Sequence, residues 1–194
     1  MTKEMSTHDK LLLTAIDLIT EKGYNGVTTQ EIAAAAGFSE KTLFRHFGRK
    51  RNLLETAFDR FNYNEEMIKI FNEKLVWELE TDLLLISRKY HEIMNRNRKM
   101  IMISIKEEGN LLEFRERLKK HPQQLMEVLI DYFAVMFEKG KLIQTNPELQ
   151  ALSFIVMNYG AFINNLDSEN NYSSLSLDEF IVGSVKTFAR ALTP

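Results

Sequence analysis

The side chains best suited to bind an anion are five cations that lie close together between Ser39 and Arg51. A single acidic residue precedes them in this stretch. A compact positive cluster of this kind attracts phosphate groups, although a basic run taken alone is also typical of a solvated helix start. The cations are Lys41, Arg45, Arg49, Lys50 and Arg51, and the acid is Glu40.

The charge distribution places this cluster in a distinct part of the chain. The formal net charge of the 194 residues is −2, which as a single number argues against a nucleic-acid partner. However, residues 1–52 hold more Lys and Arg than Asp and Glu, whereas residues 53–194 hold more acids than bases. This asymmetry predicts two domains, 1–52 and 53–194.

Side chains that would support catalysis or metal binding do not form a pattern. The chain has no cysteine, and no two of its histidines have the helical spacing of a metal-ligand pair. It lacks a glycine-rich phosphate loop and a serine elbow, and adjacent acids such as Glu107 and Glu108 are expected to be solvated. The sequence therefore predicts no enzyme, no metal site and no cofactor. The histidines are His8, His46, His91 and His121.

Helical periodicity dominates, and only three prolines interrupt it, so the predicted fold is all-α. An apolar face between Thr7 and Lys22 predicts a first helix, which Gly23 ends. A second, alanine-rich helix is capped by Thr28 or Thr29 and reaches about residue 36. The cationic cluster follows this second helix.

A third short helix is expected to carry the cluster. Gly37 breaks the second helix, and Ser39 can cap a helix that runs from Lys41 to Phe47. Two short helices joined by such a turn have the spacing of a helix-turn-helix, whose second helix enters the major groove of DNA. An outward-facing Phe44 among cations suits a surface that meets sugar, base edge and phosphate.

The stretches TTQEIAAAAGFS at 28–39 and TLFRHFGRK at 42–50 resemble the N-terminal signature of TetR-family regulators. The resemblance covers roughly the first 55 to 60 residues and implies a three-helix DNA-binding domain. By position it implies phosphate or backbone contacts by Ser39, Phe44, His46 and Lys50, and base contacts by Lys41, Thr42 and Arg45, with Thr29 also in the DNA-binding set.

Two residues depart from the family pattern. Members often have tyrosine where this chain has Phe44, so a hydroxyl-to-phosphate bond is missing here. Glu40 stands where a cation or a small residue is frequent. Both departures are expected to shift the operator preference without removing the fold.

The larger C-terminal part is predicted to be helical, with breaks near Glu73–Trp77, Asn95–Asn97, Gly109, His121-Pro122 and Gly140. Asn146-Pro147 is expected to open a strongly apolar helix to about residue 166. A last helix is expected over Leu177–Leu192.

The family resemblance implies a homodimer in which these last two helices pair with their copies. Their strongly apolar character agrees, because pairing would bury surface that a monomer could not easily cover. Two-fold symmetry predicts a palindromic operator in double-stranded DNA, with recognition helices about 34 to 36 Å apart or somewhat more. The expected interface residues are Leu152, Ile155, Phe162, Phe180 and Phe188.

Aromatic and methionine residues of the C-terminal domain suggest a pocket for a small-molecule effector, although ordinary core packing produces the same spacings. The candidate lining residues are Tyr90, Met94, Phe114, Phe133, Phe137 and Tyr159. A ligand that changes the spacing of two DNA-binding heads would bias a dimer away from DNA.

These observations predict a cytoplasmic, homodimeric transcriptional repressor that binds an operator and is released by a small, mostly apolar ligand. Repression rather than activation is implied only by the family. One alternative keeps the DNA-binding head and gives the C-terminal domain a protein partner, and another is a helical protein whose head has lost DNA binding. The residues near Met1 lack the apolar stretch of a signal peptide, and no membrane-spanning segment is expected.

Overall fold

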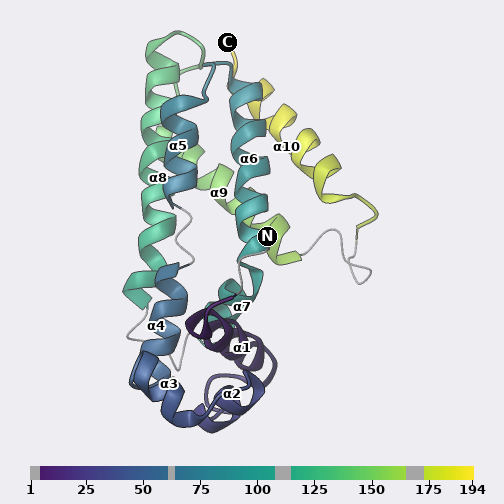
Figure 1. The fold of residues 1–194 in the computed structure, drawn as a ribbon. Helices are drawn as coiled ribbons and strands as arrows, with labels where there is room; N and C mark the ends of the chain where they lie inside the picture. Colours follow the sequence, from purple (N-terminus) through teal and green to yellow (C-terminus); the bar gives the residue numbers. More distant parts are fainter. Residues whose placement is uncertain (1–4, 61–63, 108–114, 165–172) are drawn as a thin grey trace. The chain divides into compact units, whose positions relative to one another are not determined.

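The computed structural model describes residues 5–60, 64–107, 115–164 and 173–194, and these residues form helices with no strand among them (Figure 1). The expectation of an all-α fold is confirmed. The helices are α1 (Thr7–Lys22), α2 (Thr29–Ala35), α3 (Glu40–Phe47), α4 (Lys50–Arg60), α5 (Asn64–Glu73), α6 (Leu79–Arg96), α7 (Arg98–Lys106), α8 (Arg115–Glu138), α9 (Pro147–Asn164) and α10 (Leu177–Leu192).

The chain divides into two compact units, and each unit combines two segments that are separate in the sequence. The first unit combines Met1–Asn62 with Asn97–Leu118, and the second combines Tyr63–Arg96 with Lys119–Pro194. We call the first unit the head. The predicted boundary after residue 52 falls inside α4, and α7 belongs to the head because Met100 and Ile103 pack into its core. The functional boundary between the domains stays a prediction.

Local end signals define the helices of the head. The Ser6 side chain accepts a hydrogen bond from the N–H of Asp9 at the start of α1, and Gly23 ends α1 with a φ of 78°. Both bounds agree with the prediction. The buried face of α1 joins residues of α2, α3, α4 and α7 in one apolar core. Its members on α1 are Leu11, Leu12, Ala15, Ile16 and Ile19.

In the second unit, α6 packs against α5, α9 and α10 (Figure 1). A buried carboxylate holds its first turn, because Asp82 accepts hydrogen bonds from the Val76 N–H at 2.9 Å and from the Tyr132 hydroxyl at 3.0 Å. Burial and the neighbouring Asp82 raise the pKa of the Tyr132 phenol far above its ordinary value, so this hydroxyl stays a donor. The contact ties α8 to α6.

The predicted breaks near residues 73–77, 95–97 and 140 are confirmed, but the break at His121-Pro122 is wrong. Pro122 lies inside α8, which continues to Glu138. A proline removes one main-chain hydrogen bond, and burial of apolar side chains after it can outweigh that loss. Leu125, Leu129, Tyr132, Phe133 and Met136 are buried along this stretch. The predicted break at Gly109 lies outside the described residues.

The last two helices begin where the sequence predicts. Asn146 accepts hydrogen bonds from the N–H groups of Glu148 and Leu149 at the start of α9. Ser176 and Glu179 form a capping box at the start of α10. None of the described helices combines the length and the apolar character needed to cross a membrane.

Candidate nucleic-acid interface

Helices α2 and α3 and the turn between them form a helix-turn-helix, as predicted. Thr28 caps α2 in a capping box with Glu31, and Ser39 caps α3 by accepting a hydrogen bond from the Thr42 N–H. Gly37 in the turn has a φ of 79°, a conformation that favours glycine. The turn is short because the Phe38 N–H bonds to the Ala33 carbonyl at 2.8 Å. Local hydrogen bonds therefore set the ends of both helices and the turn between them.

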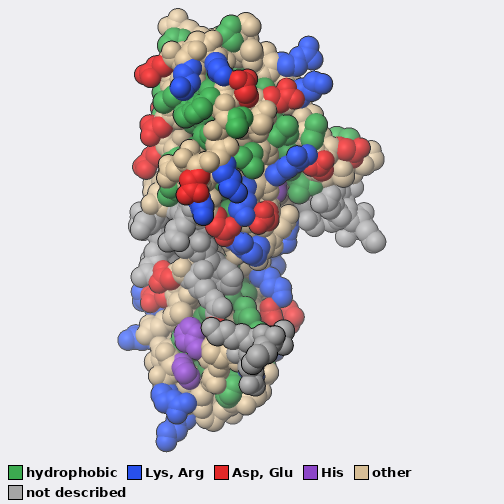
Figure 2. All heavy atoms as spheres, turned by 45° about the horizontal axis from the view of Figure 1, so that its top comes forward, with side chains coloured by type: hydrophobic (Ala, Val, Ile, Leu, Met, Phe, Trp, Pro, Cys, Tyr) green, Lys and Arg blue, Asp and Glu red, His purple; other side chains and the backbone are tan. Residues whose placement is uncertain are grey.

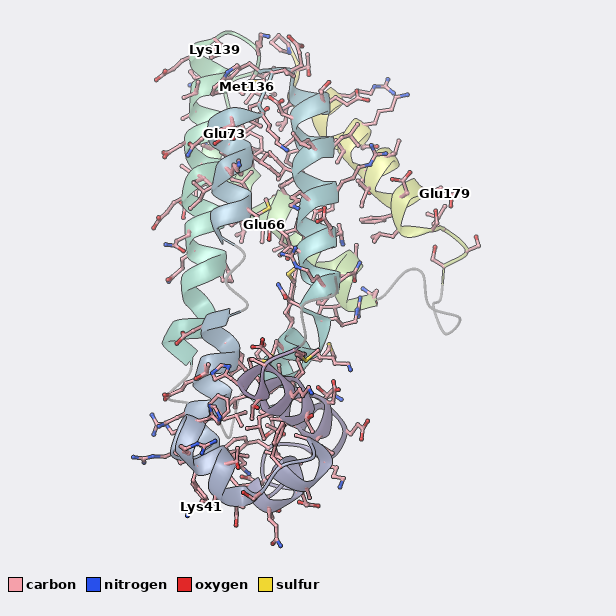
Figure 3. The ribbon with its side chains drawn as sticks, viewed as in Figure 1. Lys41, Glu66, Glu73, Met136, Lys139 and Glu179 are labelled. Atoms are coloured by element: carbon pink, nitrogen blue, oxygen red, sulfur yellow. The ribbon has the colours of Figure 1, made fainter. Side chains whose placement is uncertain are left out.

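The inner face of α3 holds it to the head, and its outer face is available to a partner. Leu43 and Phe47 are buried, whereas Lys41, Arg45 and His46 are exposed. Phe44 is 45% exposed, so its ring lies open among these side chains. Lys41 extends away from the ribbon of α3 (Figure 3). Such a face can donate hydrogen bonds to phosphates and to base edges.

Hydroxyl groups at the start of α2 and α3 are already engaged within the protein. Thr29 Oγ1 donates to Glu40 Oε1 at 2.6 Å, which joins the first residues of the two helices. Ser39 Oγ and Thr42 Oγ1 lie 3.0 Å apart and share a hydrogen bond. Glu40, which departs from the family pattern, therefore fixes Thr29, and this hydroxyl has no proton left for a phosphate.

Lys50 has a structural role that the sequence did not indicate. Its ammonium donates to the carbonyl oxygens of Tyr24 at 2.6 Å and Val27 at 2.7 Å, and it lies 4.1 Å from the centre of the Tyr24 ring. Burial lowers the pKa of Lys50, and Glu107 and Glu31 oppose that shift. Two of its three protons hold the α1–α2 link, and one remains for a phosphate at the start of α4.

Glu107 completes this arrangement, although the sequence predicted it to be solvated. Only 8% of it is exposed, and its Oε1 accepts a hydrogen bond from the Tyr24 N–H at 3.0 Å. Gly23 permits this approach, because a Cβ there would lie 2.9 Å from the same oxygen. The expectation of a solvated Glu107 is wrong, since two adjacent acids give no sequence signal that one of them turns inward. The Tyr24 residue is thus held by Glu107 through its N–H and by Lys50 through its carbonyl.

Two histidines meet beside the recognition helix. The ring of His8 on α1 lies 6.2 Å from the ring of His46 and 4.7 Å from that of Phe47. Figure 2 shows two histidine side chains next to each other on one face of the head, with Lys and Arg side chains below them. His8 was not among the predicted contacts, because nothing in the sequence indicates that the start of α1 meets the end of α3.

Comparisons with known proteins give the family. The model described as bacterial regulatory proteins, tetR family, matches residues 11–57. The HTH-type transcriptional regulator YvkB of Bacillus subtilis (strain 168) is 30% identical over 188 residues, which cover 96% of this chain and 97% of YvkB. The chain belongs to the tetR family. It is a DNA-binding transcriptional regulator, and the predicted family is confirmed.

Two further relatives extend the comparison. The negative transcriptional regulator IcaR of the Staphylococcus aureus (strain Newman) biofilm operon icaADBC is 23% identical over 150 residues, 77% of this chain and 79% of IcaR. The crystal structure of AibR in complex with isovaleryl coenzyme A and operator DNA has a TM-score of 0.69 at 22% identity, and the match covers 94% of this chain and 97% of that chain. This structural likeness shows that the regulator and AibR share a fold.

The predicted effector-binding residues of this tetR-family regulator do not share one environment. Tyr90, Met94 and Phe133 are buried in the core of the second unit. Phe137 and Tyr159 are 46% and 39% exposed. Phe114 lies outside the described residues. The structure thus buries three of the candidates and leaves two at the surface.

The predicted interface residues also separate. Leu152 is 50% exposed, and Ile155 and Phe180 are half-buried. Phe162 is 1% exposed and belongs to the regulator's own core. The half-buried Phe188 ring packs against the rings of Phe133 at 6.2 Å and Phe154 at 5.9 Å. The periodicity of α9 and α10 identifies apolar helices but not which of their faces is turned inward.

Proposed function

We propose that the regulator binds a palindromic operator as a homodimer through α3 and is released by a small, mostly apolar molecule. The observation that carries this proposal is the outer face of α3, where Lys41, Phe44, Arg45 and His46 are exposed together on a helix held firmly by its inner face. Three exposed donors beside an open aromatic ring match the major groove of DNA.

The homodimer is supported by α9, which is apolar on two opposite faces. One face is buried in the second unit, whereas five large apolar side chains of the other face are between 39% and 58% exposed. A helix that is apolar all round is normally covered on both sides. The exposed residues are Leu149, Leu152, Val156, Tyr159 and Ile163.

Two glycines with open space at the Cβ position favour close packing by a partner helix. At Gly160 on α9 and Gly183 on α10, an added Cβ would meet no atom within 4 Å. Glycine within a helix costs about 1 kcal/mol relative to alanine, and close approach of another backbone is one use that offsets this cost. Val182, next to Gly183, is 37% exposed. A second copy of α9 and α10 is the occupant that we propose for this surface.

The relatives support the regulatory part of the proposal. IcaR is a negative transcriptional regulator by name, and AibR was crystallised with operator DNA and with an acyl coenzyme A thioester. We extend to this regulator the features of repression, operator binding and a small-molecule effector. The identity of the effector is addressed below through the core of the second unit.

Gel-shift titration with the DNA upstream of the regulator's own coding region tests the proposal. The measurement uses unrelated DNA as competitor, two salt concentrations, and light scattering to determine the mass of the protein. We expect a dimer that prefers the upstream DNA and binds more weakly at the higher salt concentration. Binding without sequence preference at both salt concentrations would favour a protein partner over an operator.

We expect Arg45→Ala to weaken operator binding and to relax base preference. An arginine that reads a base edge contributes about 1 to 3 kcal/mol of discrimination, so the ratio of operator to random-DNA affinity should fall by about tenfold or more. Lys69→Ala, which removes an exposed cation from α5 in the second unit, is the matched control. Equal losses on operator and random DNA would show that Arg45 contacts only phosphate.

We expect Glu40→Gln to strengthen DNA binding. The amide oxygen of glutamine can still accept the hydrogen bond from the Thr29 hydroxyl, and the negative charge at the start of the recognition helix is removed. Affinity for random DNA should rise by about two- to fivefold at low salt and less at high salt, because ions screen the repulsion. Weaker binding by this variant in the same gel-shift titration would instead assign the carboxylate to base recognition.

A further inference from the structure

Two uncharged polar side chains lie deep in the second unit with hydrogen-bonding capacity that the described residues do not use. Ser87 on α6 is 0% exposed, and Asn158 on α9 is 2% exposed. Neither Ser87 Oγ nor Asn158 Oδ1 has a hydrogen-bond partner among the described residues. Buried polar atoms of folded proteins are almost always paired, because an unpaired one costs about 1 to 3 kcal/mol.

Ser87 differs from other helical hydroxyl groups of this chain. Thr20, Thr56 and Thr187 each donate to the main-chain carbonyl four residues earlier. Ser87 has the same opportunity within α6 and does not use it. Its hydroxyl group is therefore available both as a donor and as an acceptor.

Only the Nδ2 group of the Asn158 amide is hydrogen-bonded. Its Nδ2 donates to the Phe154 carbonyl at 2.8 Å, which leaves Oδ1 as an acceptor without a donor among the described residues. Helices α6 and α9 pack against each other, so the two side chains lie on neighbouring helices of the second unit. His91, one turn after Ser87 on α6, is also buried, with its ring 5.5 Å from that of Tyr90.

The charges of this core limit what it can hold. The one buried carboxylate among the described residues of the second unit, Asp82, already accepts hydrogen bonds from the Tyr132 hydroxyl and the Val76 N–H. Among the described residues of the second unit, no Lys or Arg is buried. An ionised group brought into such surroundings would find no buried Lys or Arg and no carboxylate without partners, so it would lose much more by desolvation than an uncharged polar group.

We propose that the effector is an apolar molecule with an uncharged polar group, such as an alcohol, phenol or amide, bound between α6 and α9. The polar group donates a hydrogen bond to Asn158 Oδ1 and accepts one from the Ser87 hydroxyl, while apolar side chains of the second unit enclose the rest. The proposal deepens the proposed function and rests on it, since it assigns the chemistry of the molecule that releases the regulator from DNA.

Four probes with one eight-carbon chain test the head group: 1-octanol, octanamide, octanoate and octylamine. We expect 1-octanol and octanamide to raise the melting temperature of the full-length protein by about 3 °C at ten times their Kd. Octanoate and octylamine should bind at least about tenfold more weakly. Preferred binding of either charged probe, or no shift with any of the four, would overturn the proposal.

The variants Ser87→Ala and Asn158→Leu test the residues. Replacing the unpaired Ser87 hydroxyl is neutral or stabilising, so Ser87→Ala should melt at or above the wild-type temperature without a probe. Asn158→Leu removes the unpaired Oδ1 but also the hydrogen bond from Nδ2 to the Phe154 carbonyl, so this variant should melt within about 4 °C of the wild type. Both should lose the shift caused by octanamide. Thr81→Ala, at an exposed position of the same helix, is the control and should keep that shift. A lower melting temperature in Ser87→Ala, or a fall of more than about 4 °C in Asn158→Leu, would show that the side chain is structural and would overturn its assignment.

A gel shift of the wild-type protein without any probe separates this proposal from the proposed function. Operator binding together with preference for a charged probe would overturn only the head-group assignment. Absence of operator binding would overturn the proposed function itself. Release of the operator by octanamide but not by octanoate would support both.

Discussion

A Val156→Glu variant is expected to be a monomer and to bind the operator at least about a hundredfold more weakly than the wild type. Val156 is 58% exposed and lies in the middle of the apolar outer face of α9. In a two-fold interface each α9 would meet its copy, so one substitution places two carboxylates in an apolar contact. A monomer engages one half-site and loses the gain from linking two heads, which is about 10² to 10⁴ in affinity.

Val76→Glu provides the matched control for this variant. Val76 is 57% exposed and lies in the link between α5 and α6, so the same chemical change is made at nearly the same exposure but away from α9. Light scattering should give a dimer for Val76→Glu and a monomer for Val156→Glu, with both proteins melting cooperatively. Two dimers, or two monomers, would overturn the proposed interface. Phe162 is unsuitable for this test, because a charge at a 1% exposed position would disrupt the core.

A Lys50→Met variant is expected to lose operator affinity and head stability together. Methionine keeps most of the side-chain volume, but the carbonyls of Tyr24 and Val27 lose the ammonium that now binds them. Hydrogen bonds to a charged donor contribute about 1.5 to 3 kcal/mol each, and the partial exposure of Lys50 places the expected loss of unfolding free energy near the low end, about 2 kcal/mol. The link that positions α2 should loosen, which weakens binding to any DNA sequence.

Arg49→Met separates the charge of Lys50 from its structural role. The Arg49 side chain is exposed and makes no hydrogen bond or ion pair with the described residues, so its replacement subtracts one positive charge and little else. Both variants should lower the salt slope of binding by about one unit for each subunit. Only Lys50→Met should reduce the urea midpoint of unfolding. Equal urea midpoints for the two variants would show that the carbonyl contacts of Lys50 contribute nothing to stability.

The sequence by itself determined those features that depend on neighbouring residues along the chain. Gly23 ends α1, Ser39 caps α3 and Gly37 makes the turn, whereas the cap of α2 stayed open between Thr28 and Thr29 until the structure assigned it to Thr28. These signals work over a few residues, through caps and left-handed turns, so they can be read without knowing the fold. The outward face of α3 could be predicted in the same way, because the helical period alone places Leu43 and Phe47 on one face and Lys41 and Arg45 on another.

Tertiary structure decided which long-range partners meet. Glu107 lies more than eighty positions after Tyr24 and still binds its N–H, and Lys50 binds the carbonyl of the same residue. Because α9 is apolar on two faces, the spacing of its apolar residues does not show that Phe162 is buried and Val156 is exposed. Ser87 and Asn158 look like ordinary polar helix residues until α6 and α9 pack and exclude water from both. Burial and pairing depend on packing between distant segments, whereas caps and turns depend only on adjacent residues.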